Sequence, residues 1–146
     1  MNADSTFKNE HALQAAIVVW YWNTYPERRG TLWANFAEQN KIQASIKKPL
    51  GLVRALPDLM TVQDGKLIGI ELKLPGTKHE RNHLIEQATW LIERPYKGYF
   101  CDSLDMAKGI LEGTGEGIDP RKVLRYIQSS KNKYFLWGIW EKSLSL

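Results

Sequence analysis

The chain has 146 residues, and its twenty Lys and Arg against sixteen Asp and Glu give a net charge of +4. This length fits a single domain that buries about two-thirds of its unfolded surface. The charge is a modest bias toward polyanions and does not by itself establish nucleic-acid binding. The single cysteine, Cys101, excludes a disulfide within the chain and is more typical of a buried strand thiol than of a catalytic nucleophile.

The apolar run from Ala15 to Trp22 is too short to span a bilayer, which needs about 20 residues. The chain does not open with a basic stretch followed by a long apolar run. We therefore expect a cytoplasmic protein, or a nuclear one in a eukaryote. Neither a membrane nor an organic cofactor is expected among its partners.

Residues 9–24 are predicted to form a helix, because apolar side chains recur at helical spacing and Pro26 ends the pattern. A first strand is expected at 31–36, and a short basic helix at 41–48, closed by Pro49. The first part of the chain therefore has the order helix, strand, helix.

A β-hairpin is predicted around the Asp-Gly pair at 64–65, because both central residues of such a turn need positive φ. Its strands are the β-prone runs 59–63 and 66–73. Symmetric pairing about the turn sets Asp58 opposite Glu71, and facing residues on antiparallel strands have Cβ atoms about 5 Å apart. Two carboxylates at that separation are close enough to share a divalent cation and repel each other without one.

Alternation along the second strand sends Glu71 and Lys73 to one face. Ile70, Leu72 and Leu74 point to the other face, as core residues. Oxygen ligands favour Mg²⁺ or Mn²⁺, which activate a bound water, and a nearby ammonium can neutralise charge that develops on a phosphate. The layout thus predicts metal-assisted phosphodiester hydrolysis, although the spacing alone is also compatible with an ordinary surface hairpin.

Beyond the hairpin, a helix is predicted at 80–94, ended by Pro95. A buried strand at 97–101 and a helix at 104–112 follow. Together these elements predict an α/β fold in which helices flank a mixed central sheet.

A glycine-rich segment at 113–117 is the one plausible seam, so we expect a core of residues 1–112 and an appendage of residues 113–146. The appendage is expected to pack on the core or at a dimer interface. Its predicted elements are a helix at 119–129, which begins with a good Asp-Pro cap, and a strand at 134–140.

Aromatic and basic residues mark this appendage. We expect Trp137 and Trp140 to pack against the domain or a partner rather than to stack on bases. Its basic rim, which is also compatible with ordinary solvation, consists of Arg121, Lys122, Arg125, Lys131 and Lys133.

Three segments together resemble the PD-(D/E)XK nucleases and are most similar to the VRR-NUC branch: Gly51-Leu-Val-Arg-Ala-Leu-Pro-Asp58, Gly69-Ile-Glu71-Leu-Lys73 and Gln87-Ala-Thr-Trp90-Leu. In that family an N-terminal helix bearing a Glu precedes these motifs, and here Glu10 opens the first predicted helix. The resemblance spans about residues 9–112. It departs from the family at Ala55-Leu56, where a Gly near the acid is common.

This resemblance implies a restriction-endonuclease-like core and a Mg²⁺- or Mn²⁺-dependent endodeoxyribonuclease. A stand-alone domain of this kind implies a homodimer that cuts branched DNA such as a Holliday junction, because two symmetric cuts need two active sites. The implied catalytic residues are Asp58, Glu71, Lys73 and Gln87, and the implied metal ligands are Asp58, Glu71, Leu72 and Glu10.

Two of these positions have ordinary alternatives. Glu10 also suits a solvated first-turn glutamate favoured by the helix dipole. Gln87 also suits a residue that packs or caps on a half-buried helix. For DNA contacts we expect five cations that flank the site, each also compatible with a solvated surface charge: Lys47, Lys48, Arg54, Lys78 and Arg81.

A rival motif lies at His79-Glu80-Arg81-Asn82-His83, which matches the letters of the zinc-protease pattern H-E-x-x-H. Pro75-Gly76 lies too close upstream for this motif to sit well inside a helix, so we disfavour it. A non-catalytic DNA-binding module and a nuclease subunit that needs a partner remain alternatives with the same fold.

Overall fold

The computed structural model describes residues 7–36 and 56–138. The basic helix predicted at 41–48 lies outside these residues, as do Lys47, Lys48, Arg54 and Trp140.

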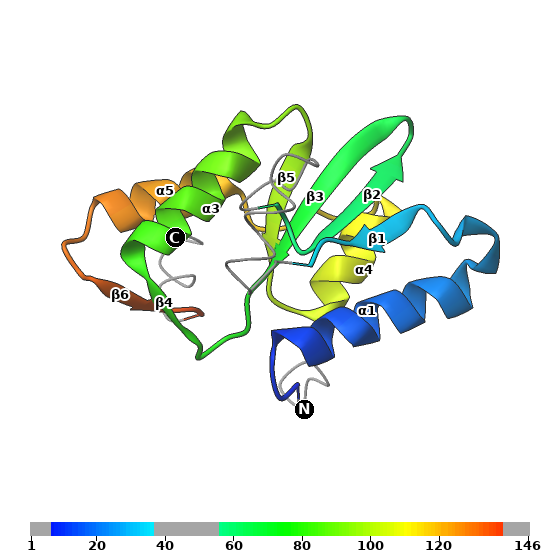
Figure 1. Cartoon of the computed structure of the whole chain (residues 1–146), viewed down its shortest axis with the longest axis horizontal. Coiled ribbons are helices and arrows are strands. Elements are labelled where there is room, and N and C mark those ends of the chain that lie inside the picture. The colour runs from blue at the N-terminus through cyan, green and yellow to red at the C-terminus, as the bar shows by residue number, and fades with distance from the viewer. Residues whose placement is uncertain (1–6, 37–55, 139–146) are drawn as a thin grey trace, which may run out of the picture.

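The described residues form a mixture of helices and strands (Figure 1). The elements are α1 (Glu10–Thr24), the 3₁₀ turn η2 (Pro26–Arg28), β1 (Leu32–Ala34), β2 (Leu59–Gln63), β3 (Lys66–Leu72), β4 (Lys78–Glu80), α3 (Arg81–Glu93), β5 (Lys97–Cys101), α4 (Leu104–Glu112), α5 (Pro120–Gln128) and β6 (Tyr134–Leu136).

The predicted helices at 9–24, 80–94, 104–112 and 119–129 are confirmed, with ends within one residue of α1, α3, α4 and α5. Local capping accounts for much of this agreement. The side chains of Asn9, Ser103 and Asp119 accept hydrogen bonds from the first turns of α1, α4 and α5. Gly113, with φ of 75°, ends α4 in the left-handed conformation.

The main sheet is mixed and has the strand order β1-β2-β3-β5. β2 is antiparallel to β1 and to β3, whereas β3 and β5 are parallel. The predicted hairpin is confirmed, because Gln63 pairs with Lys66 and Leu59 pairs with Ile70. Its turn has φ of 52° at Asp64 and 75° at Gly65. The α/β class with a mixed sheet flanked by helices is thus confirmed.

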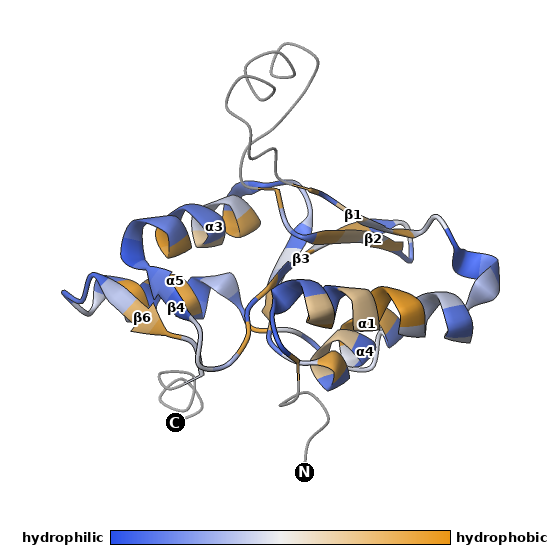
Figure 2. Ribbon diagram, turned by 60° about the horizontal axis from the view of Figure 1, so that its bottom comes forward, coloured by the Kyte–Doolittle hydropathy of each residue, from blue (hydrophilic) through white to orange (hydrophobic). Residues whose placement is uncertain are grey.

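Helices cover both faces of this sheet (Figures 1 and 2). On one face, α1 and α4 lie side by side and form a core with apolar residues of the strands, among them Leu59, Ile68, Ile70 and Leu72. On the other face, α3 and α5 pack together over β5, where Phe100 joins their core. The two cores therefore meet across the strands β3 and β5.

The segment after α4 closes against the rest of the chain. β6 pairs antiparallel with β4, a short strand that sequence patterns did not predict. Trp137 is 1% exposed, and its indole Nε1 donates a hydrogen bond of 3.2 Å to Asp102 Oδ2. The predicted strand at 134–140 ends at Leu136, because Trp137 and Gly138 turn away and Gly138 has φ of 96°.

Candidate functional site

Two ionisable side chains are buried on the face of β3 opposite its apolar residues. Glu71 is 6% exposed and Lys73, directly after the strand, is 2% exposed. Strand alternation explains the placement, since Ile70 and Leu72 fill the core on the other side. The predicted separation of Glu71 and Lys73 from the apolar residues is therefore confirmed.

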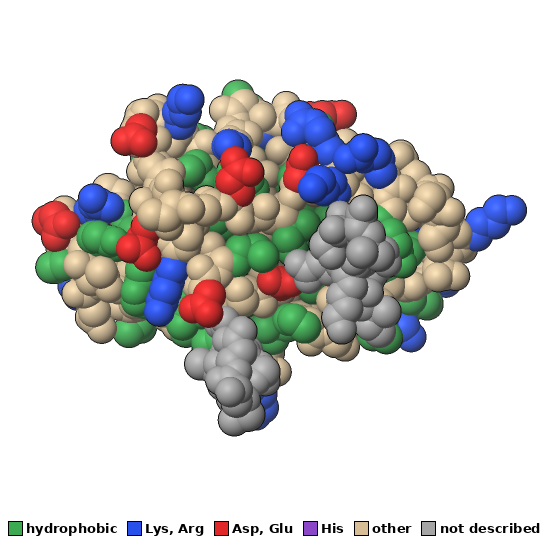
Figure 3. All heavy atoms as spheres, turned by 180° about the vertical axis from the view of Figure 1, so that it is seen from behind, with side chains coloured by type: hydrophobic (Ala, Val, Ile, Leu, Met, Phe, Trp, Pro, Cys, Tyr) green, Lys and Arg blue, Asp and Glu red, His purple; other side chains and the backbone are tan. Residues whose placement is uncertain are grey.

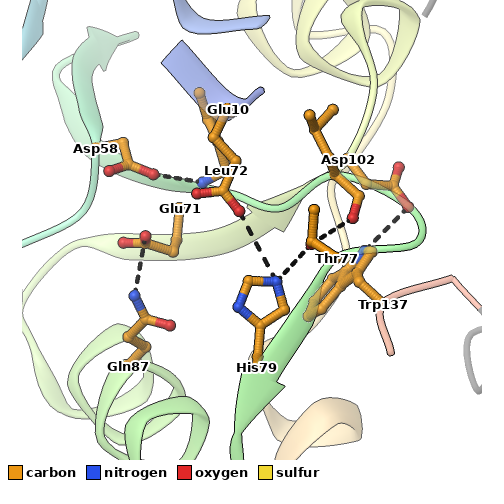
Figure 4. Close-up of polar contacts among 10 residues, drawn as sticks. Glu10, Asp58, Glu71, Leu72, Thr77, His79, Gln87, Asp102 and Trp137 are labelled. Carbon is orange, nitrogen blue, oxygen red and sulfur yellow. Dashed lines mark hydrogen bonds and ion pairs between the residues drawn. The ribbon is translucent and has the colours of Figure 1, made fainter. Parts of the chain in front are cut away.

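Asp58, the residue just before β2, contacts β3 through its side chain. Its Oδ2 accepts a hydrogen bond of 2.8 Å from the backbone N–H of Leu72, as Figure 4 shows. The recorded pairing ends at Leu59 and Ile70, and the next step of the same register would set Asp58 opposite Glu71, as the hairpin symmetry predicts. One Asp58 oxygen thus holds the strand pair, and the Asp58 carboxylate also lies close enough to Glu71 to raise the pKa of that residue.

Two further residues fix the Pro57-Asp58 backbone. Asn35, just after β1, donates from its backbone N–H to Asp58 O at 2.9 Å and from Nδ2 to Pro57 O at 3.0 Å. At Gly69 a Cβ atom would lie 2.7 Å from Pro57 Cγ and 2.9 Å from Tyr96 Cε2. Neither Asn35 nor Tyr96 was predicted from the sequence, in which the only available signal was a glycine inside a predicted strand, which often marks a close approach.

Gln87 brings α3 to this site. Its Nε2 donates a hydrogen bond of 3.0 Å to Glu71 Oε1. Its own Oε1 is buried and has no hydrogen-bond partner among the described residues. Buried acceptors are nearly always paired in folded proteins, so this oxygen suits a donor, such as a water molecule, that occupies the site.

The electrostatics of the site oppose ionisation of its glutamates. Burial, and then the neighbouring Asp58 carboxylate, raise the pKa of Glu71 well above its usual range, while Lys73 acts in the other direction. Burial also raises the pKa of Glu10, against a lowering by Lys73. Each shift indicates that negative charge here lacks full compensation from the protein.

Glu10, at the start of α1, reaches the edge of the same site. Its Oε1 lies 3.8 Å from His79 Nε2, which is 2.6 Å from Thr77 Oγ1 (Figure 4). Because the Thr77 hydroxyl donates to Leu74 O, His79 must donate from Nε2. Burial and Lys73 lower the pKa of His79 to about 4, so the ring is neutral at pH 7 and makes no true ion pair with Glu10.

The histidines do not form the helical zinc pattern. His79 belongs to β4, whereas α3 begins only at Arg81 and contains His83. The two rings therefore do not share one helical face. Among residues 7–36 and 56–138, no three His, Cys, Asp or Glu side chains lie close enough together to hold a metal ion.

The donor set fits a hydrated Mg²⁺ or Mn²⁺ better than an ion held wholly by protein. Mg²⁺ commonly binds through one or two carboxylates and keeps several waters. Asp58 and Glu71 supply such a pair, and the unpaired Gln87 Oε1 can accept a hydrogen bond from a bound water. Leu72 has a fully buried apolar side chain, so only its backbone carbonyl can serve as a ligand.

Of the residues predicted to contact DNA, Lys78 and Arg81 have different surroundings in the structure. Lys78 is exposed, with Nζ 4.3 Å from the ring centroid of Tyr134. Arg81 Nη1 instead donates to the backbone carbonyls of Ile127, at 2.7 Å, and Ser130. The Arg81 guanidinium therefore stabilises the end of α5.

No protein-family model matches this chain, and no curated protein or solved structure is significantly similar to it. The fold class rests on the geometry described above, a mixed sheet between two helical layers. In the described part of the chain, none of the helices has both the length and the apolar character needed to cross a bilayer.

Proposed function

We propose that this protein is a Mg²⁺- or Mn²⁺-dependent endodeoxyribonuclease of the PD-(D/E)XK type, similar to the VRR-NUC branch. One observation carries the proposal: Glu71 and Lys73 are buried on one face of β3, beside Asp58. Hydrophobic packing does not explain the burial of these two ionisable side chains. Such burial is costly for charged groups unless a ligand compensates it. A divalent cation and a phosphodiester would do so.

The strand order β1-β2-β3-β5, with α1 ahead of it, supports a restriction-endonuclease-like core. The motif residues that suggested the family come from distant parts of the chain. Asp58, Glu71 and Gln87 nonetheless meet at one place, and Glu10 lies at its edge (Figure 4). This convergence favours the nuclease interpretation over an ordinary surface hairpin.

In this proposal Asp58 and Glu71 hold the cation, and Gln87 keeps the Glu71 carboxylate oriented. The cation supplies an activated water and charge stabilisation. Lys73 stabilises negative charge that develops on the phosphate, because its ammonium is buried and has no ion pair within 4 Å among the described residues. Addition of water to phosphorus breaks one P–O bond and leaves a phosphate monoester and a hydroxyl.

The preferred substrate is proposed by family resemblance. The resemblance to stand-alone VRR-NUC proteins suggests a homodimer that cuts branched DNA such as a Holliday junction. A labelled four-way junction and a linear duplex of the same sequence, each incubated with Mg²⁺ or Mn²⁺, test both points. Light scattering on the same sample gives the oligomeric state.

We expect metal-dependent cleavage that Glu71→Ala abolishes. The matched control is Glu93→Ala, which removes an exposed glutamate from α3 and should cleave like the parent. Absence of cleavage under all metal conditions, or cleavage that survives Glu71→Ala, contradicts the proposal. Metal-free DNA binding without any cleavage would instead support a non-catalytic module.

A further inference from the structure

The short strand β4 has one side chain that faces the candidate site and two that face solvent. Inward, His79 has a side chain only 13% exposed, 3.8 Å from Glu10, with its ring edge-on to Trp137. Outward, Lys78 and Glu80 are exposed. Strand β4 therefore lies between the outer face of the β4–β6 sheet and the candidate site.

An exposed tyrosine on that outer face is flanked by two lysines. Lys78 Nζ is 4.3 Å, and Lys133 Nζ 5.6 Å, from the ring centroid of Tyr134. Tyr134 is 46% exposed. Among residues 7–36 and 56–138, no carboxylate lies within 4 Å of either ammonium. Contact with a ring holds a cation in place without neutralising it.

The surroundings are positive as well. Five Lys and Arg, and no Asp or Glu, occur between Pro120 and Gly138. In the view from behind, several Lys and Arg side chains gather over the half of the molecule that carries α5 (Figure 3). Glu80, opposite Tyr134 in the strand register, is an acidic residue on this face.

We propose that Lys78, Lys133 and Tyr134, here called the Tyr134 patch, bind the sugar-phosphate backbone of nucleic acid beside the candidate active site. The proposal deepens the proposed function, since the bound polymer would be the substrate. Two ammonium groups that have no carboxylate partner in the described part of the chain supply charge complementarity to phosphates, and the tyrosine supplies a hydroxyl donor. These contacts position the polymer and do not depend on base sequence.

Salt dependence of binding tests this patch directly. The variant Lys78→Gln/Lys133→Gln is titrated with labelled duplex and four-way junction in EDTA, so that no cleavage occurs. Each lost phosphate contact should reduce the slope of log K against log salt by about 0.9, or about 2 for both. The control Lys66→Gln/Lys97→Gln removes the same charge at the far end of the sheet, where these residues line a separate hollow beside the hairpin turn.

We expect weaker binding and a shallower slope for the patch variant, a smaller change for the control, and tighter binding for Glu80→Gln. Thermal melting verifies that each variant is folded. Equal effects of the two double variants, or no binding by the parent, overturn the patch. If the parent protein binds DNA but never cleaves it, the nuclease proposal is refuted and the Tyr134 patch is not. If the parent protein cleaves DNA and the patch variant binds DNA normally, the Tyr134 patch is refuted and the nuclease proposal is not.

Discussion

The two faces of β3 are equally buried but chemically opposite. On one face Ile68, Ile70 and Leu72 are at most 5% exposed and pack against α1 and α4. On the other, Glu71 and Lys73 are 6% and 2% exposed. Apolar burial stabilises the fold by about 25 cal/mol per Å², whereas burial of ionisable groups costs free energy unless partners compensate it. The apolar face of β3 thus stabilises the fold, whereas burial of the ionisable face lowers its stability. Such a loss is expected of a site that binds a ligand.

The strongest way to separate the two faces is to change one residue on each. Lys73→Met removes the ammonium but keeps an unbranched chain, and should lower cleavage by about 10²–10³-fold, the usual loss when one electrostatic stabiliser is removed. Metal binding should persist, because Asp58 and Glu71 remain. Initial cleavage rates at saturating Mg²⁺, together with a metal titration followed by thermal melting, measure both effects.

Ile70→Ala is the counterpart on the apolar face. It should destabilise the protein by about 2–5 kcal/mol, because Ile70 is fully buried, and should leave the cleavage rate of the folded protein nearly unchanged. The comparison fails if Lys73→Met retains full activity. It also fails if Ile70→Ala loses activity at temperatures where it is folded.

A second test concerns the close approach that positions Asp58. Gly69→Ala should destabilise the protein by about 1–3 kcal/mol, because the new Cβ would lie 2.7 Å from Pro57 and 2.9 Å from Tyr96. Gly109→Ala is the control, since its Cβ would meet nothing closer than 3.5 Å and alanine favours a helix by about 1 kcal/mol. Urea midpoints of the two variants should shift in opposite directions, and shifts of the same sign would contradict the steric argument.

The sequence predicted local structure well because its signals are local. The turn at Asp64-Gly65, with strands symmetric about it, is enough to predict that Asp58 lies near Glu71. Helix caps at Asn9 and Asp119 likewise lie beside the elements that they begin. In each case the residues that set the structure are within a few positions of it.

Contacts between distant segments were not predictable in this way. β4 has the polar sequence Lys-His-Glu and becomes a strand only because β6 pairs with it from more than fifty residues away. Arg81 was expected near DNA but binds carbonyls at the end of α5, which no pattern around residue 81 signals. Gln87 was predicted at the site only through a family resemblance, because helical periodicity says nothing about Glu71.

The smallest expected effect concerns the stability cost of Glu71 itself. Because burial and Asp58 raise the pKa of Glu71 above its ordinary value of 4.5, the folded state binds this proton more tightly than the unfolded state. The contribution of this group to metal-free stability is therefore full at low pH and is lost as pH rises through the raised pKa. Glu71→Gln should remove that loss at neutral pH, raising Tm by about 3 °C for each kcal/mol recovered.

Thermal melts of Glu71→Gln in EDTA at pH 4 and pH 7.5 measure this effect, with the exposed Glu93→Gln as control. The gain over the parent should appear at pH 7.5 and vanish at pH 4, and Mg²⁺ should raise the Tm of the parent but not of Glu71→Gln. A gain at both pH values would mean that improved packing, rather than relief of a buried charge, stabilises the variant. If Glu71→Gln is less stable than the parent at pH 7.5, Lys73 and Gln87 already compensate the charge of the Glu71 carboxylate. The polar face of β3 would then be an ordinary buried polar network rather than a site that lacks its cation.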